Sequence, residues 1–146
     1  MRILLIGEFS RLHNSLKEGL VALGHEVVIV ANGDGFKNYP VDLSTKARIS
    51  ESKLMKLPRK VIYKLTNIDI AALEFGFRFY FHLKKLKNFD IVQLINEAPI
   101  QTIPIFERFL LKKIFKNNDK IFLLWRGVDY VIAKYLIEKK KRYSIM

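Results

Sequence analysis

The sequence predicts an α/β fold in which helices flank a parallel sheet, and three observations indicate it. Residues 2–7 form an apolar run that ends at a glycine, which is typical of a strand buried on both faces. Leucines recur at helical spacing over residues 13–23, and Gly24 suits the end of that helix. A β-branched run, residues 27–31, follows at once. Because a right-handed crossover places two such strands side by side, this β-α-β unit predicts the fold class.

The chain has 146 residues, of which 50% are hydrophobic, so it can bury one core. It is too short for two domains of ordinary size. We therefore expect a single domain over residues 1–146. Cysteine is absent, which excludes disulfides and thiolate metal sites, and the three histidines are too scattered to predict a metal site. The opening apolar run is too short for a signal peptide. We expect a cytoplasmic protein.

The middle of the chain is harder to assign. A turn is expected at residues 32–35, and residues 36–60 are irregular and basic, with Pro40 and Pro58 limiting any helix. Residues 66–69 have the form of a capping box, which predicts a long helix from there to about Lys87. Charged residues within this helix favour a buried helix over a membrane span.

The remainder resumes the alternation of strand and helix. A third strand is expected at residues 90–96, a helix at residues 104–116 and a fourth strand at residues 120–125. A last helix ends in the basic run at residues 139–142.

The formal net charge is +12, and residues 46–64 hold seven basic residues against one acid, Glu51. Such a segment attracts anionic partners in general, or it serves only as a solubilising surface. No RNA- or DNA-binding motif accompanies the charge, so we expect no nucleic-acid partner.

Ligands of open α/β sheets bind outside the carboxyl ends of the strands, so the loops there supply the candidate residues. The first loop has one glycine where a dinucleotide site needs three, and no P-loop motif occurs. The start of the first helix suits an anion or a sugar hydroxyl. The candidates are Gly7, Glu8, Phe9, Ser10, His13, Asn14, residues 32–34, Asn96, Glu97, Arg126, Gly127 and Asp129.

Each candidate has a functional and a structural interpretation. His13 either donates to a ligand or bonds a neighbouring carbonyl group, and Glu97 either accepts a hydroxyl proton or caps the next helix. Arg126 can pair with a phosphate, and Asp129 can bind a hydroxyl or begin a helix cap. His25 and His82 are expected to be structural.

Residues 1–20 and 23–28 resemble the start of a GT-B glycosyltransferase of the bacterial family 4-like, or group 1, type. Residues 33–40 resemble the second loop of that family, and residues 126–130 resemble a loop after its fourth strand.

The resemblance implies that residues 1–146 are the Rossmann-like N-terminal domain, which binds the acceptor, and that the donor-binding C-terminal domain is absent. It implies transfer of a sugar from a nucleotide-sugar donor to a hydroxyl, with no other cofactor. The donor is expected in the missing domain, which a second chain would supply unless this chain is a truncated product.

Glu97 and His13 are the catalytic candidates, and by the resemblance the loop that carries Glu8, Phe9, His13 and Asn14 shapes the acceptor site. The substrate-binding candidates are Gly7, Glu8, Phe9, Asn14, Asn96, Arg126 and Asp129. Some relatives place a histidine after the fourth strand, where this chain has Arg126, so a catalytic histidine at that place is not expected.

The implied acceptor is a glycan or a lipid-linked sugar of polysaccharide biosynthesis. Residues 46–64 would then dock on anionic lipid, which implies peripheral contact with the inner face of the plasma membrane. The alternative function is a non-catalytic basic binding module that docks on a membrane surface or on a partner enzyme.

Overall fold

The computed structural model describes residues 1–124 and Lys134, and it confirms the α/β class. Five parallel strands form one sheet in the order β3-β2-β1-β4-β5. The strands are β1 (Arg2–Ile6), β2 (Glu26–Ala31), β3 (Leu43–Ser44), β4 (Ile91–Leu94) and β5 (Lys120–Leu123). The helices are α1 (Leu12–Ala22), α2 (Lys56–Thr66), α3 (Ile70–His82) and α4 (Pro104–Asn117), with short 3-10 turns η1 (Gly35–Lys37), η2 (Lys53–Met55) and η3 (Leu83–Lys85).

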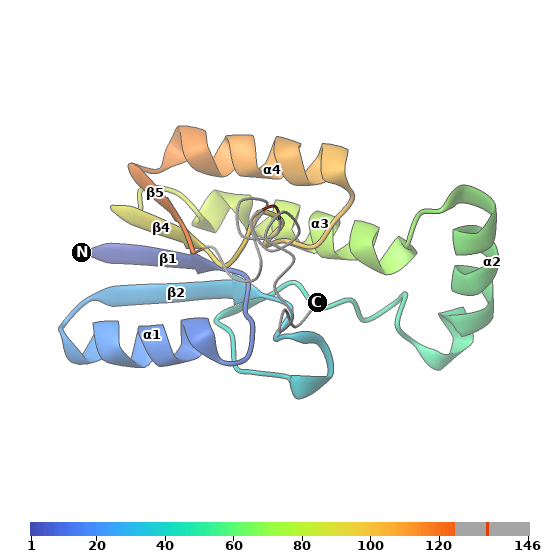
Figure 1. Cartoon of the computed structure of the whole chain (residues 1–146), viewed down its shortest axis with the longest axis horizontal. Helices are drawn as coiled ribbons and strands as arrows, with labels where there is room; N and C mark the ends of the chain where they lie inside the picture. The colour runs from blue at the N-terminus through green and yellow to red at the C-terminus, as the bar shows by residue number, and fades with distance from the viewer. Residues whose placement is uncertain (125–133, 135–146) are drawn as a thin grey trace.

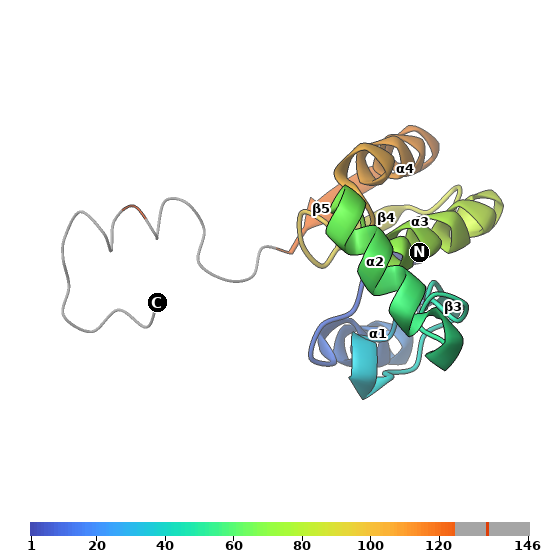
Figure 2. The same ribbon diagram turned by 90° about the vertical axis from the view of Figure 1, so that its right-hand side faces the viewer.

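The central strand β1 is apolar on both faces because helices cover both faces of the sheet. Leu4 and Ile6 point into one core, beneath α3 and α4, and Ile3 and Leu5 point into the other, beneath α1. Figure 2 shows α1 on one side of the sheet and α3 with α4 on the other. Each strand beside β1 pairs with it in register, Ile3 lying opposite both Val27 and Ile91. The continuous apolar run therefore reports a strand buried from both sides.

Residues 36–60, which the sequence does not assign, contain the strand β3, the start of the helix α2, the 3-10 turn η2 and most of the 3-10 turn η1. The two-residue strand β3 pairs with the end of β2, since Val30 lies opposite Leu43. The helix α2 begins at Lys56, so Pro58 falls in its first turn, where a missing N–H costs no hydrogen bond. In Figure 1, α2 stands apart from the sheet and from the helices that cover it.

The predicted capping box is wrong. The Thr66 hydroxyl donates back to the Ile62 carbonyl at 2.8 Å, inside α2. The left-handed residue Asn67, with φ 56°, then ends that helix. Asp69 caps α3 instead, accepting from the Ala71 N–H at 3.0 Å. Residues 66–87, expected as a single long helix, therefore hold the last residue of α2, the whole of α3 and the turn η3, because the chain turns at Asn67.

The remaining assignments hold, with shifted ends. α1 and α4 lie within one residue of their predicted bounds, whereas β4 and the strand predicted as the fourth are shorter than expected. That strand is β5, because β3 intervenes. Trp125 and all of the last predicted helix except Lys134 lie outside the described residues. Within the described part of the chain, no helix is long and apolar enough to cross a membrane.

Candidate functional site

The order of the strands locates the candidate site. The chain moves outward from β1 to β2 and β3 on one side, then to β4 and β5 on the other. In such sheets ligands bind where the order reverses, outside the carboxyl ends of the two strands that flank the reversal, here β1 and β4. We call residues 7–11, 32–39 and 95–103 the carboxyl-edge loops, since they follow β1, β2 and β4.

Gly7 joins two of these loops by close packing. Its φ is +86°, and a Cβ there would lie 2.4 Å from the Ile95 Cγ2 atom and 3.0 Å from the Pro99 carbonyl oxygen. The loop after β1 therefore packs directly on the loop after β4. In this structure the space beside Gly7 belongs to the protein itself and not to a ligand.

Glu8 is buried, with 1% of its surface exposed, and its carboxylate caps α1. One oxygen accepts from the Phe9 N–H at 2.7 Å and the His13 N–H at 3.3 Å. The other accepts from the Asn14 N–H at 2.9 Å and from the Asn14 side-chain amide. The side chain of the N-cap residue, Arg11, makes no capping hydrogen bond. Glu8 thus occupies the place at the helix N-terminus where an anionic ligand would otherwise bind.

His13 is completely buried beside this carboxylate. Its Nδ1 atom lies 2.7 Å from the Gly7 carbonyl oxygen, so Nδ1 carries the proton and donates it. Its Nε2 atom is covered and has no hydrogen-bond partner among the described residues. Burial lowers the pKa of His13, although the Gly7 carbonyl and the Glu8 charge act in the opposite direction. This arrangement keeps a neutral ring in place and presents no atom to a substrate.

Four of the predicted residues in the loops after β1 and β4 reach the surface, one of them being Ser10, which is exposed. Phe9 and Asn96 are partly exposed and Glu97 is exposed, whereas Asn14 is buried with its amide on Glu8. The Asn96 side chain accepts from the Ala98 N–H at 3.0 Å and so shapes its own turn. The alternative role of Glu97, as a cap of the next helix, does not occur, because the N-cap of α4 is Ile103. Arg126 and Asp129 lie outside the described residues.

Polar side chains tie the loops together, among them Asn32 and Asp34, which the sequence placed in the candidate loops, and Gln101 and Lys37, which it did not single out. The Asn32 amide donates to the Gln101 side-chain oxygen at 2.8 Å, which joins the loops after β2 and β4. The Asp34 carboxylate accepts from the Ser10 N–H at 2.8 Å, which joins the loops after β1 and β2. Lys37 pairs with Asp34 at 2.9 Å, and its ammonium lies 5.3 Å from the centre of the Phe9 ring. The three loops therefore form one polar rim.

A second buried carboxylate, Glu107 of α4, holds the loop after β4. It accepts from the Ile100 N–H at 2.8 Å and the Thr102 N–H at 2.9 Å. Burial raises its pKa, and these backbone hydrogen bonds oppose the rise. The signal in the sequence is an acidic residue in the first turn after Pro104, a common place for a carboxylate that serves a helix N-terminus.

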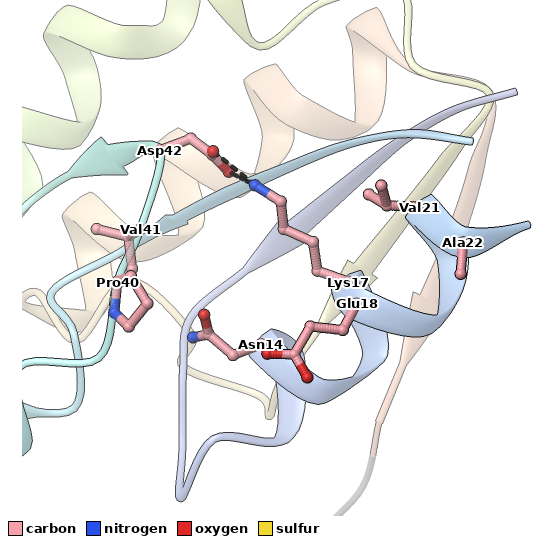
Figure 3. Close-up of a pocket in the computed structure, with 8 residues that line it drawn as sticks. All are labelled: Asn14, Lys17, Glu18, Val21, Ala22, Pro40, Val41 and Asp42. Carbon is pink, nitrogen blue, oxygen red and sulfur yellow. Dashed lines mark hydrogen bonds and ion pairs between the residues drawn. The ribbon is translucent and has the colours of Figure 1, made fainter. Parts of the chain in front are cut away.

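The cavity in Figure 3, of about 570 Å³, lies beside the rim, between α1 and residues 40–42. Its cation, Lys17, forms an ion pair of 2.6 Å with Asp42, and its Val21, Ala22 and Val41 side chains are aliphatic. The charge of Lys17 is thus neutralised within the protein. No group of three His, Cys, Asp or Glu residues in the described part of the chain is placed to hold a metal ion.

His13 makes the stability of the domain depend on pH. The folded state keeps the ring neutral, because burial lowers its pKa, whereas the unfolded chain takes up a proton near the ordinary histidine pKa. The free energy of unfolding should therefore fall as the pH is lowered from about 7.5 to about 5.5. In urea titrations, His13→Gln should reduce this fall, while the control His82→Gln should not. An unchanged pH dependence in His13→Gln would contradict the assignment.

Comparisons of the chain with protein-family models, with curated proteins and with solved structures find no match. The resemblance to a glycosyltransferase therefore depends only on residues 1–20, 23–28, 33–40 and 126–130.

Proposed function

We propose that this domain supplies the acceptor side of a sugar transferase, completed by a domain that binds the nucleotide sugar. The observation that carries this proposal is the polar rim at the β1/β4 crossover. Amide, hydroxyl and carboxylate groups gather there, at Ser10, Asn32, Asn96, Glu97 and Gln101. Such groups both donate and accept hydrogen bonds, as the hydroxyls of a sugar require.

The position of Glu8 supports an acceptor over a nucleotide at this edge. A nucleotide sugar carries a diphosphate, and the usual place for it in an α/β sheet is the N-terminus of the first helix. The Glu8 carboxylate already accepts the His13 and Asn14 N–H groups there. A diphosphate at that place would meet a buried negative charge, so the edge favours a neutral, hydroxyl-bearing ligand.

In the proposed reaction an acceptor hydroxyl attacks the anomeric carbon of the donor sugar. The bond from that carbon to the phosphate oxygen breaks, and the nucleoside diphosphate leaves with the electron pair. Glu97, an exposed carboxylate in the loop after β4, takes the hydroxyl proton as general base. His13 acts at a distance as a positioning residue, since it holds the Gly7 carbonyl at the base of the rim.

Glu97→Gln tests this assignment, because it keeps the shape of the side chain and removes the base. In the complex with the chain that supplies the donor domain, sugar transfer from a mixture of nucleotide sugars to a membrane extract should fall by a factor of about 100 or more. The control, Glu18→Gln, changes an exposed acid of α1 and should leave transfer unchanged. Transfer that is equal in Glu97→Gln and the wild type would remove Glu97 from the mechanism. A complex that transfers no sugar would contradict the proposed function itself.

A second function, docking on a membrane surface, is favoured by α2. Leu57, Val61 and Leu65 recur at helical spacing, and 76%, 56% and 78% of their respective surfaces are exposed. Leu54, in the preceding turn η2, continues the stripe with 91% exposed. None of the residues of α2 is buried. An apolar stripe of this kind on an isolated helix is the face that other α/β helices place against their sheet.

The charges of α2 indicate what covers the stripe. The helix carries Lys56, Arg59, Lys60 and Lys64 and no acidic residue. Only Arg59 is neutralised within the described structure, by Asp69 at 2.6 Å. A short helix with an apolar stripe and cationic flanks lies in the interface of an anionic bilayer, its leucines among the acyl chains and its lysines among the headgroups. This contact would place the domain at the inner face of the plasma membrane.

Leu57→Asp with Leu65→Asp tests the docking. Vesicles of phosphatidylcholine and phosphatidylglycerol should bind the wild type on centrifugation, and the double variant should bind at least about tenfold more weakly. The matched control is Leu23→Asp at the end of α1, where the side chain is 73% exposed and off the stripe. Equal binding of the double variant and the control would refute docking through α2. If the wild type bound vesicles of phosphatidylcholine alone as tightly as the anionic vesicles, the role assigned to the lysines would be refuted.

A further inference from the structure

A groove of about 520 Å³ lies between the C-terminal halves of α3 and α4, on the outer surface of the helix layer. It is separate from the polar rim, because α3 and α4 run antiparallel to the strands and end near the opposite edge of the sheet. The following 3-10 turn η3 supplies part of its wall. We call it the lysine groove.

Four lysines line the groove, Lys84 and Lys87 from the α3 side and Lys113 and Lys116 from α4, and no acidic residue lines it. Among the described residues, none of the four forms an ion pair with an acid. Lysines are favourable near the C-terminal ends of helices, and this accounts for the lysine pair at the end of α3 and for the pair at the end of α4, each taken alone. It does not explain why both pairs face one concavity, where their charges repel one another unless an anion lies between them.

Aromatic rings form the apolar part of the same groove. Phe81, Tyr80 and Phe109 are 75%, 47% and 44% exposed. Tyr80 and Phe109 are nearly parallel, with an interplanar angle of 24° and centroids 6.5 Å apart. Phe81 meets Tyr80 edge to face, and the Lys113 ammonium lies 5.5 Å from the centre of the Phe109 ring. Because the rings contact one another and a lysine, they form an apolar shelf and not an open platform for stacked bases.

We propose that the lysine groove binds the phosphate headgroup of an anionic membrane lipid. The ammonium groups hold the phosphate oxygens, and the aromatic shelf contacts the glycerol and the first methylenes of the acyl chains. A volume of this size suits a headgroup. A symmetric dimer through this groove is disfavoured, because it would bring four more lysines against these four.

This inference rests on the proposed docking at a membrane and adds a second point of contact. α2 precedes the start of α3 and the groove lies at its end, so the two contacts are separated by about 20 Å, the length of α3. Two contacts at that spacing would fix how the domain lies on the bilayer. The groove also makes a prediction that does not depend on α2, since a lipid in free solution can enter it.

The test uses dihexanoyl phosphatidic acid, a soluble short-chain lipid, titrated into the full chain and followed by calorimetry. Lys84→Gln with Lys113→Gln, one lysine from each wall, should weaken binding by about tenfold or more. The matched control, Lys56→Gln with Lys60→Gln, removes the same charge from α2 and should leave this affinity unchanged. Equal weakening in both double variants, or no binding by the wild type, would overturn the headgroup site.

A second variant tests the apolar shelf. Phe81→Ala, at a largely exposed side chain, should weaken binding of the short-chain lipid and leave weak binding of inorganic phosphate unchanged. Inorganic phosphate that binds the wild type as tightly as the lipid would overturn the lipid assignment, and so would tighter binding of a single-stranded oligonucleotide. The double variant Leu57→Asp with Leu65→Asp separates the two contacts. If it binds both the short-chain lipid and the vesicles as the wild type does, the result would support the groove and refute docking through α2.

Discussion

The buried carboxylate of Glu8 is the interaction on which the carboxyl edge of this sheet depends. It satisfies the N–H groups of Phe9, His13 and Asn14 together, so the turn after β1 and the first turn of α1 are held by one side chain. An unpaired carboxylate would cost several kcal/mol to bury, whereas each hydrogen bond to a charged acceptor contributes about 1.5–3 kcal/mol. The charge is therefore stable in the core only with all of its partners, and this requirement fixes the geometry of the loop.

The same device recurs at two other loops. Glu107 holds the N–H groups of Ile100 and Thr102, and Glu74 of α3 holds those of Arg48, Ile49 and Ser50. Burial alone would raise the pKa of Glu74, but hydrogen bonds from Ser50 and Arg48 outweigh it and keep the pKa well below the usual range. The chain has 14 acidic and 26 basic residues, and several of the acidic side chains thus hold backbone N–H groups of its own loops. The excess of positive charge remains on the surface, where α2 and the lysine groove present it.

This division of charge separates two kinds of recognition. At the carboxyl edge the candidate anion site is filled by Glu8, which leaves a rim of amides, hydroxyls and one exposed carboxylate for a neutral ligand. On α2 and in the lysine groove, lysines without acidic partners lie beside exposed leucines or aromatic rings, a combination that suits anionic lipid. Under the proposed function, the carboxyl edge would hold the acceptor and the basic surfaces would hold the membrane.

The sequence predicted the fold because the β1, α1 and β2 signals are local: an apolar run, a leucine stripe and a β-branched run. It did not predict α2, whose stripe has no partner among the described residues and whose first turn contains Pro58. The sequence located the candidate loops, but it did not predict that Glu8 is buried. Only the folded loop brings the Glu8 carboxylate onto the N–H groups five and six residues later. The lysine groove was equally hidden, since Lys84 and Lys113 meet only when α3 and α4 pack together.

Amide hydrogen exchange in Glu8→Gln, compared with the wild type and with Glu18→Gln, tests the central role of the Glu8 carboxylate most directly. A glutamine has one acceptor oxygen where the carboxylate has two, so protection should fall at the Phe9, His13 and Asn14 amides while the amides of β1 and β2 stay protected. Glu18→Gln should change none of them. Full protection of those three amides in Glu8→Gln would show that the loop holds its shape without the charge, and would contradict this account.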